Sequence, residues 1–140
     1  LGLKASFERL LDFLNADRDY ITDVEIDDVS CETDDYFCIT LYRVVQECLL
    51  NIKKHSQATR VLFHCKKTEQ QYEILIQDNG KGFTMEEAED KANSHFGLAL
   101  IHEGVNLLNG TIHVSSAIGR GTTIDIKIPL DLHSAVKKNS

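Results

Sequence analysis

Proline and long apolar runs are scarce in this sequence, and basic residues are fewer than acidic ones. Its 140 residues include one proline, and 42% of them are hydrophobic, which argues against a disordered chain and predicts a packed core. The formal charge is −7, which disfavours a nucleic-acid partner because phosphate contacts need clustered lysine and arginine. No apolar run approaches the roughly 18 residues of a membrane span, and no secretory pattern is present.

The cysteines show no sign of a metal or disulfide framework. Cys31, Cys38, Cys48 and Cys65 form no C-x-x-C pair, so a zinc site is not expected. Reduced thiols in a cytoplasmic setting fit this spacing better than disulfides. The chain begins at Leu1 and opens directly on an amphipathic segment. We therefore expect a fragment of a longer protein, and such a parent can still be membrane-anchored.

Three segments repeat apolar residues at helical spacing. They are residues 2–15, 36–55 and 96–109. The third is expected to stop at Gly110, because glycine readily adopts the left-handed conformation that ends helices. Between them, the mostly charged segment 83–95 carries one capping-box match, Thr84-Met85-Glu86-Glu87.

Strand character appears in five segments, at residues 21–26, 60–66, 71–78, 111–116 and 122–128. The second and third, and likewise the fourth and fifth, are joined by short polar connections and predict hairpins. With helices between these units, the predicted fold is a two-layer α/β (α+β) sandwich. A mixed, mostly antiparallel sheet of about five strands is covered on one face by about three helices. One domain is expected over residues 1–130, followed by a polar tail at 131–140.

Polar residues cluster on one side of the long central helix. Glu47 and Asn51 are four apart and share a face, Lys54 returns to nearly the same side, and His55 is four from Asn51. An amide oxygen can bind Mg²⁺, a carboxylate can accept a proton from a nucleophile, and a lysine can meet a phosphate. The alternative is an ordinary solvated face of an amphipathic helix.

A second motif, Asp78-Asn79-Gly80-Lys81-Gly82, follows the strand at 71–78. Two glycines let the backbone approach a flat or charged ligand, and the Asp78 carboxylate can accept a hydrogen bond from an exocyclic amine. The alternative is a common Asn-Gly turn.

Two further glycine motifs occur later in the chain. Phe96-Gly97-Leu98 begins the third predicted helix, where exposed backbone N–H groups favour phosphate. Gly119-Arg120-Gly121-Thr122 can place the Thr122 hydroxyl beside Asp78 if the two hairpins are neighbours. The alternatives are a helix-entry glycine and a simple hairpin turn.

In order and spacing, the four motifs together resemble the catalytic domain of sensor histidine kinases. Residues 41–47 and the ending Lys54-His55-Ser56 are typical of the subfamily that pairs with response regulators carrying a helix-turn-helix output domain. The resemblance implies a GHKL (Bergerat) fold, Mg²⁺-dependent ATP binding, and transfer of the γ-phosphoryl group to a histidine on an upstream dimerisation segment. It also implies relay to a response regulator, a homodimeric parent and a monomeric isolated domain.

The resemblance assigns roles to individual residues. Glu47 resembles the acidic residue that activates the attacking histidine, and Asn51 resembles the Mg²⁺ ligand. Lys54 and His55 resemble phosphate-side residues. Asp78, supported by Thr122, resembles the carboxylate that reads the adenine amino group, so ATP should be preferred over GTP. The other residues assigned to ATP binding are Gly80, Gly82, Gly97, Leu98 and Gly121, and residues 83–95 correspond to the mobile lid.

The sequence departs from the family pattern at two positions. His95 stands where the third motif commonly has glycine, and Gly104 follows Glu103 where arginine is common. These departures motivate one alternative, a degenerate binding module, and a second alternative is another GHKL enzyme, such as an ATPase or a protein-serine kinase. His102-Glu103-Gly104-Val105-Asn106 imitates a phosphoacceptor motif, but its position makes it part of the third predicted helix, so the acceptor histidine is expected upstream of Leu1.

Overall fold

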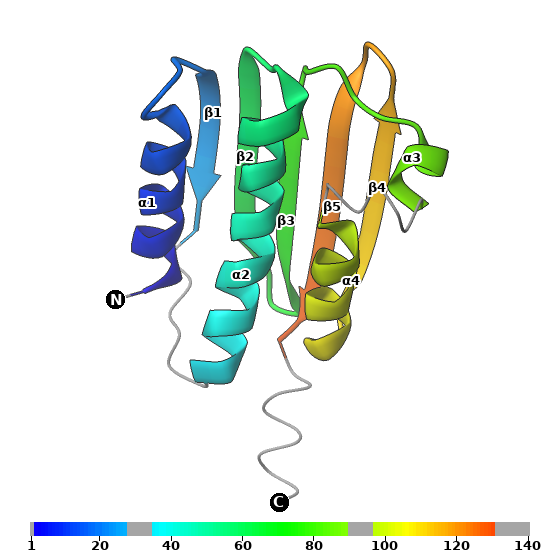
Figure 1. Cartoon of the computed structure of the whole chain (residues 1–140). Helices are drawn as coiled ribbons and strands as arrows, with labels where there is room; N and C mark the ends of the chain where they lie inside the picture. The colour runs from blue at the N-terminus through cyan, green and yellow to red at the C-terminus, as the bar shows by residue number, and fades with distance from the viewer. Residues whose placement is uncertain (1, 28–34, 90–96, 131–140) are drawn as a thin grey trace, which may run out of the picture.

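The computed structural model describes residues 2–27, 35–89 and 97–130, and these contain a five-stranded sheet. The elements are α1 (Leu3–Asn15), β1 (Ile21–Ile26), α2 (Asp35–Asn51), the π-helical turn η1 (Ile52–Ser56), β2 (Arg60–Lys67), β3 (Gln71–Asp78), α3 (Met85–Glu89), α4 (Leu98–Leu107), β4 (Thr111–Ala117) and β5 (Gly121–Pro129). The strand order is β1-β2-β3-β5-β4; β1 pairs with β2 in parallel, and the other pairs are antiparallel. Helices α1, α2 and α4 cover one face (Figure 1), which confirms the predicted fold class.

The core lies between that sheet face and the three long helices. Alternate residues of β2, β3 and β5 are buried, as the two-residue period of a strand requires. From the helix side, Phe7 of α1 packs edge-on against Phe63 of β2, with ring centroids 5.6 Å apart. In the described part of the chain no helix covers the opposite face, and its side chains are exposed or only partly buried.

The helices differ from their predicted bounds in two informative places. The helix predicted at 36–55 is α-helical only to Asn51, and a π turn follows at Ile52–Ser56. The final helix ends through Asn109 rather than Gly110: Asn109 has φ +58°, and the Gly110 N–H reaches back to the Val105 carbonyl at 2.9 Å. Asparagine tolerates the left-handed conformation. Gly110 is needed for space instead, since a Cβ there would lie 2.7 Å from the Lys127 carbonyl oxygen.

The capping box predicted at 84–87 forms. The Glu87 N–H donates to Thr84 Oγ1 at 3.1 Å, and the Thr84 N–H donates to Glu87 Oε2 at 3.4 Å. These reciprocal bonds start the short helix α3 in a segment that has no apolar pattern.

The expectation about the cysteines is partly wrong. Cys48 and Cys65 are buried free thiols, but Cys38 is disulfide-bonded. Cysteine spacing and number indicate only which redox state is usual in a cellular compartment. The fold decides which sulfur atoms come within bonding distance.

No helix in the described part of the chain combines the length and apolar composition that a membrane crossing needs. The predicted tail at 131–140 and residues 90–95 of the predicted lid at 83–95, His95 among them, lie outside the described residues.

Candidate functional site

One pocket between the helix layer and the sheet gathers residues from all four sequence motifs. Its lining consists of Cys48, Asn51, Ile52, His55, Ser56, Ile76, Asp78, Gly82, Phe83, Leu98, Thr122 and Ile124. Aliphatic and aromatic side chains form much of the wall, while amide, imidazole, hydroxyl and carboxyl groups stand among them. Such a site suits a flat aromatic ring with polar edges, held at one side by hydrogen bonds.

Asp78 ends β3 at this pocket. Its Oδ1 accepts a hydrogen bond from the Gly80 N–H at 2.8 Å. Burial raises the pKa of the Asp78 carboxyl, while backbone hydrogen bonds from Gly80 and Thr122 act in the lowering direction. A carboxylate has about four lone-pair positions, so acceptor capacity is left for a donor on a bound ligand.

Thr122 lies directly opposite Asp78 in the β3–β5 register, because the two predicted hairpins are neighbours in the sheet. Its hydroxyl oxygen is 2.8 Å from Ser116 Oγ. Ser116 Oγ also donates to the Gly121 carbonyl at 3.1 Å and accepts from the Phe83 N–H at 2.9 Å. Because the one Ser116 proton goes to Gly121, the Thr122 hydroxyl donates to Ser116 and keeps its lone pairs for a ligand.

Ser116 supports Thr122 beside the pocket, and the sequence analysis does not identify it. The predicted hairpin could have identified Ser116, because a turn at 117–121 places residue 116 opposite residue 122. The structure has Ser116 and Thr122 paired in this register.

The Asn-Gly segment after β3 serves mainly to shape the pocket. Asn79 Oδ1 accepts from the backbone N–H groups of Thr59 and Arg60 at 2.9 and 2.8 Å, so Asn79 joins the end of β3 to the start of β2. A Cβ on Gly80 would collide with the backbone carbonyl of buried Ser56. The Lys81 N–H bonds the same carbonyl at 2.7 Å.

Gly82 and Gly121 are required by backbone geometry. Both have positive φ, +66° and +78°. A Cβ on Gly82 would collide with the Ala117 carbonyl, and one on Gly121 with the Asp78 carbonyl. Only glycine lets these two loops approach so closely, and the approach brings the Asp78 end of β3 against the turn that leads into Thr122.

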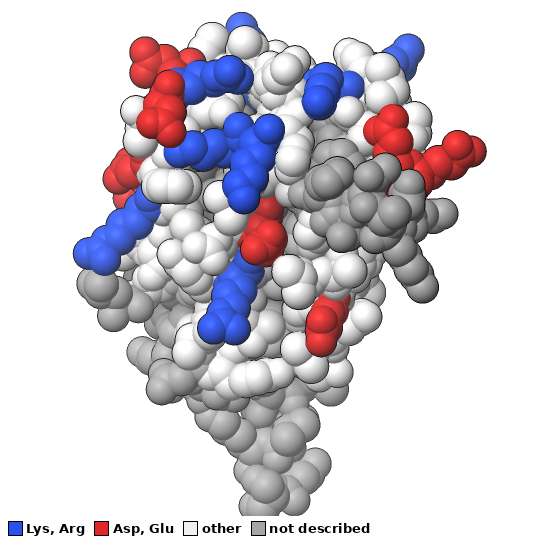
Figure 2. Space-filling model, viewed as in Figure 1, with Lys and Arg blue, Asp and Glu red and all other residues white. Residues whose placement is uncertain are grey.

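The helix side of the pocket is built from the end of α2 and from η1. Asn51 and His55 line the pocket, whereas Lys54 is exposed and does not line it. The π turn widens the last turn of the helix, and such turns frequently occur at functional sites. Lysine and arginine side chains gather around this C-terminal end of α2 on the helix-covered face (Figure 2), an arrangement that favours an anionic group.

Glu47 lies beside the N-terminus of α4. A Cβ on Gly97 would come 2.8 Å from Glu47 Oε2, and Gly97 itself has φ +58°. The carboxylate of the first motif and the glycine of the third are therefore neighbours, although they are 50 positions apart in the sequence.

The structure thus groups the predicted site residues other than Lys54 around one pocket. Asn51, His55, Asp78, Gly82, Leu98 and Thr122 line it, Gly80 and Gly121 pack next to Asp78, and Glu47 and Gly97 adjoin one another. The pocket is partly open to solvent, and the space within it that water can occupy is about 30 Å³, room for roughly two water molecules.

Comparison with known proteins finds one family over most of the chain. The family model described as histidine kinase-, DNA gyrase B-, and HSP90-like ATPase matches residues 38–132. The signal transduction histidine-protein kinase/phosphatase DegS of Bacillus subtilis (strain 168) is 43% identical over 96 residues, 69% of this chain and 25% of DegS. The sensor histidine kinase LiaS of the same strain is 34% identical over 131 residues, 92% of this chain and 34% of LiaS. The chain spans about a quarter to a third of these curated relatives.

Solved structures share the fold. The histidine kinase domain of the Erythrobacter litoralis EL346 blue-light activated histidine kinase matches with a TM-score of 0.79 at 20% identity, covering 96% of this chain and 64% of that one. The mycobacterial sensor histidine kinase MprB matches with a TM-score of 0.72 at 24% identity, covering 92% of this chain and 95% of that one.

Proposed function

This chain belongs to the family of histidine kinase-, DNA gyrase B- and HSP90-like ATPases, and we propose that it is the ATP-binding catalytic domain of a two-component sensor histidine kinase. It binds Mg²⁺-ATP, and the γ-phosphoryl group passes to a histidine on an upstream dimerisation segment for relay to a response regulator. The observation that carries the proposal is that Asp78 of the sheet and Asn51 of the helix layer line the same pocket.

Adenine recognition is assigned to the sheet side. The Asp78 carboxylate accepts a hydrogen bond from the adenine amino group, and the Thr122 hydroxyl offers lone pairs beside it. Apolar residues such as Ile76 and Ile124 line the same pocket and pack against the ring. Guanine would present a carbonyl oxygen to the Asp78 carboxylate, leaving two acceptors face to face, so ATP is preferred over GTP.

The triphosphate is assigned to the helix side. Mg²⁺ binds proteins through few side-chain oxygens and keeps waters and phosphate oxygens as its other ligands, so the Asn51 amide in the pocket wall fits this ion. When bound, Mg²⁺ neutralises phosphate charge. His55 and the basic residues around the end of α2 add positive or hydrogen-bonding groups. The role of accepting the proton of the attacking histidine is assigned to Glu47, which lies next to Gly97.

Calorimetry with ATP and Mg²⁺ tests the binding step. We expect one site on the chain, and we expect Asp78→Asn to weaken ATP binding by roughly 10- to 100-fold, since a hydrogen bond to a charged group contributes about 1.5–3 kcal/mol. Asp78→Asn keeps an acceptor for the Gly80 N–H, so the variant should fold normally. Asp125→Asn, on the neighbouring strand β5, is the matched control and should bind like wild type. Absent ATP binding, or equal binding by the Asp78 variant, contradicts the proposal.

A longer protein that includes the upstream segment tests the transfer step. With that segment present, ATP should produce acid-labile phosphate on a histidine, and Glu47→Gln should lose this product while still binding ATP. Rapid ATP hydrolysis by the isolated domain would instead favour an ATPase, and binding without any phosphohistidine would favour a non-catalytic module.

A further inference from the structure

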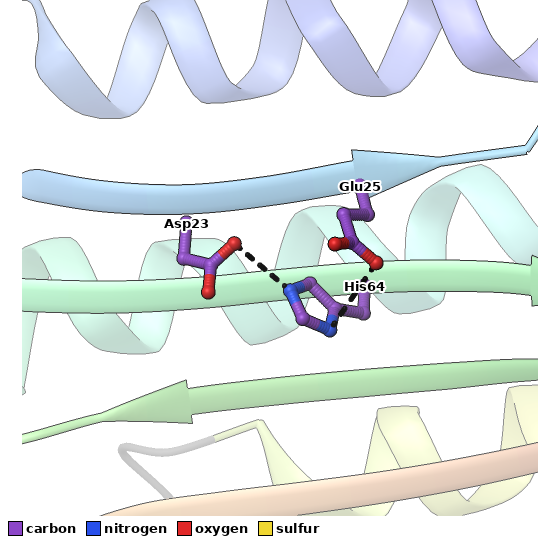
Figure 3. Close-up of side chains that lie close together, drawn as sticks. All are labelled: Asp23, Glu25 and His64. Atoms are coloured by element: carbon purple, nitrogen blue, oxygen red, sulfur yellow. Dashed lines mark hydrogen bonds and ion pairs between the residues drawn. The ribbon is translucent and has the colours of Figure 1, made fainter.

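The uncovered face of the sheet carries three metal-ligating side chains at its β1 edge. Asp23 and Glu25 extend from β1 and His64 from β2, and Figure 3 shows the imidazole between the two carboxylates. We call these three residues the edge cluster. Glu25 pairs directly with His64 in the parallel register, and Asp23 lies two residues earlier on the same face. The neighbouring Phe63 is fully buried in the core, which places His64 on the opposite side of the sheet.

The distances within the edge cluster are close to those of a metal site. His64 Nε2 is 3.1 Å from Asp23 Oδ1, and His64 Nδ1 is 4.0 Å from Glu25 Oε2. One ligand atom from each residue can be chosen so that all three lie within 4.8 Å of one another. A tetrahedral Zn²⁺ with bonds of about 2.1 Å holds its ligand atoms about 3.4 Å apart. The two contacts use different ring nitrogens, and one ion can bind only one of them. The carboxylate beside the other nitrogen therefore has to turn toward the shared ion, which its exposure allows.

The charge of the edge cluster also points to a cation. Two carboxylates contribute −2, and the imidazole contributes at most +1. Among the described residues, neither carboxylate forms an ion pair with lysine or arginine. The His64 side chain is only 19% exposed, against 64% for Asp23 and 62% for Glu25, so the ring is held in place while the carboxylates can adjust.

We propose that the edge cluster binds Zn²⁺, or a similar borderline divalent cation, through His64, Asp23 and Glu25, with water completing the coordination shell. Imidazole with carboxylate favours such ions, whereas Mg²⁺ and Ca²⁺ prefer oxygen-only sites. The absence of a C-x-x-C pair argues only against a zinc site built from cysteines, and the edge cluster contains no cysteine. The ion would link the edge strand β1 to β2 and so stabilise that margin of the sheet. The proposal is independent of the ATP pocket.

Calorimetric titration of the nucleotide-free chain with Zn²⁺, in buffer without Mg²⁺ or chelator, tests the site. We expect one bound ion per chain, loss of that binding in His64→Gln, and weakening by at least about tenfold in Asp23→Asn and Glu25→Gln, since even outer-shell partners of a metal ligand can contribute that much. His113→Gln is the matched control. His113 is an exposed histidine on β4, it pairs with Asp125, and it belongs to no three-residue ligand group among the described residues.

Thermal unfolding supplies a second readout. Zn²⁺ should raise the melting temperature of wild type and of His113→Gln, and should leave His64→Gln unchanged. The proposal is overturned if wild type binds no Zn²⁺, if His64→Gln binds as tightly as wild type, or if His113→Gln loses as much affinity as His64→Gln. Melting curves without Zn²⁺ establish that each variant folds. If His64→Gln does not fold, the exposed substitution Glu25→Gln decides the question by the same criteria.

Discussion

The hydroxyl of Ser116 joins three segments of the pocket wall. It holds the Phe83 N–H, the Gly121 carbonyl and the Thr122 hydroxyl within hydrogen-bond distance. We expect Ser116→Ala to lower the free energy of unfolding by about 1–2 kcal/mol, because the part-buried Phe83 N–H loses its acceptor. ATP affinity should fall as well, because Thr122 loses the group that orients its hydroxyl.

Urea unfolding and calorimetry measure these two effects. Ser115→Ala is the control, since the exposed neighbour Ser115 lies on the other face of β4 and should change stability by less than about 0.5 kcal/mol. Equal behaviour of the two variants would mean that Ser116 does not support the pocket.

The two buried free thiols predict a loss of stability in alkali. Burial, as the largest cause, raises the pKa of both Cys48 and Cys65 to about 12. Unfolded thiols ionise near pH 8.5 to 9, so between about pH 9 and 12 the folded state holds more protons than the unfolded state. The contribution of these thiols to the free energy of unfolding is therefore complete below about pH 9 and is lost as pH rises toward 12.

Alkylation with iodoacetamide, located by mass spectrometry, checks the same burial near pH 8. Cys48 and Cys65 should stay unmodified in the native protein and react once urea unfolds it, because the thiolate is the reactive form. Rapid native labelling of either cysteine would contradict the assigned burial.

At the scale of elements, Gly104 lets helix α4 approach helix α2. A Cβ at Gly104 would lie 2.5 Å from Val44 Cγ2, and Val44 is a stiff β-branched residue in α2. The missing arginine after Glu103 is thus replaced by a residue that the helix packing needs. Because Gly104 has this packing role, its presence is no sign of a degenerate domain.

Gly104→Ala should therefore destabilise the protein even though alanine is the better helix former. Helix propensity favours alanine by about 1 kcal/mol, but overpacking costs about 1–3 kcal/mol, so we expect a net loss of up to about 2 kcal/mol. In a double-mutant cycle measured by urea unfolding, Val44→Ala should relieve part of that loss, giving a favourable coupling energy. Additive effects of the two changes would show that the helices do not press together at this point.

At the scale of the whole molecule, nucleotide binding should stabilise both layers together, because the pocket wall includes α2, η1, β3, α4 and β5. At an ATP concentration about 100 times the Kd, linkage predicts about 2.7 kcal/mol of added stability, a rise in Tm of roughly 10 °C for a domain of this size. Thermal scans with Mg²⁺-ATP measure this shift. GTP should give a smaller one, and a shift of equal size with both nucleotides would argue against adenine reading by Asp78.

Much of the fold could be predicted because its signals are local. The alternation in 71–78 and 122–128 and the apolar spacing in 2–15 identified their elements within a residue or two of the observed ends. The π turn at Ile52–Ser56 could not be predicted, since one extra residue per turn barely changes an apolar pattern. The sequence alone favours Gly110 over Asn109 as the helix end, although both residue types suit that position. The structure shows that Asn109 takes the left-handed conformation and that Gly110 is needed for the narrow space beside Lys127.

The sequence by itself determined the elements, the four motifs and the residues that could bind nucleotide, because periodicity, turn chemistry and motif spacing are properties of neighbouring residues. Only the tertiary structure decided which distant residues meet. The strand order sets Thr122 against Asp78, and the packing of α4 sets Gly97 against Glu47. The parallel pairing of β1 with β2 gathers the edge cluster. Such contacts depend on strand order and helix packing over the whole chain, which no local pattern encodes.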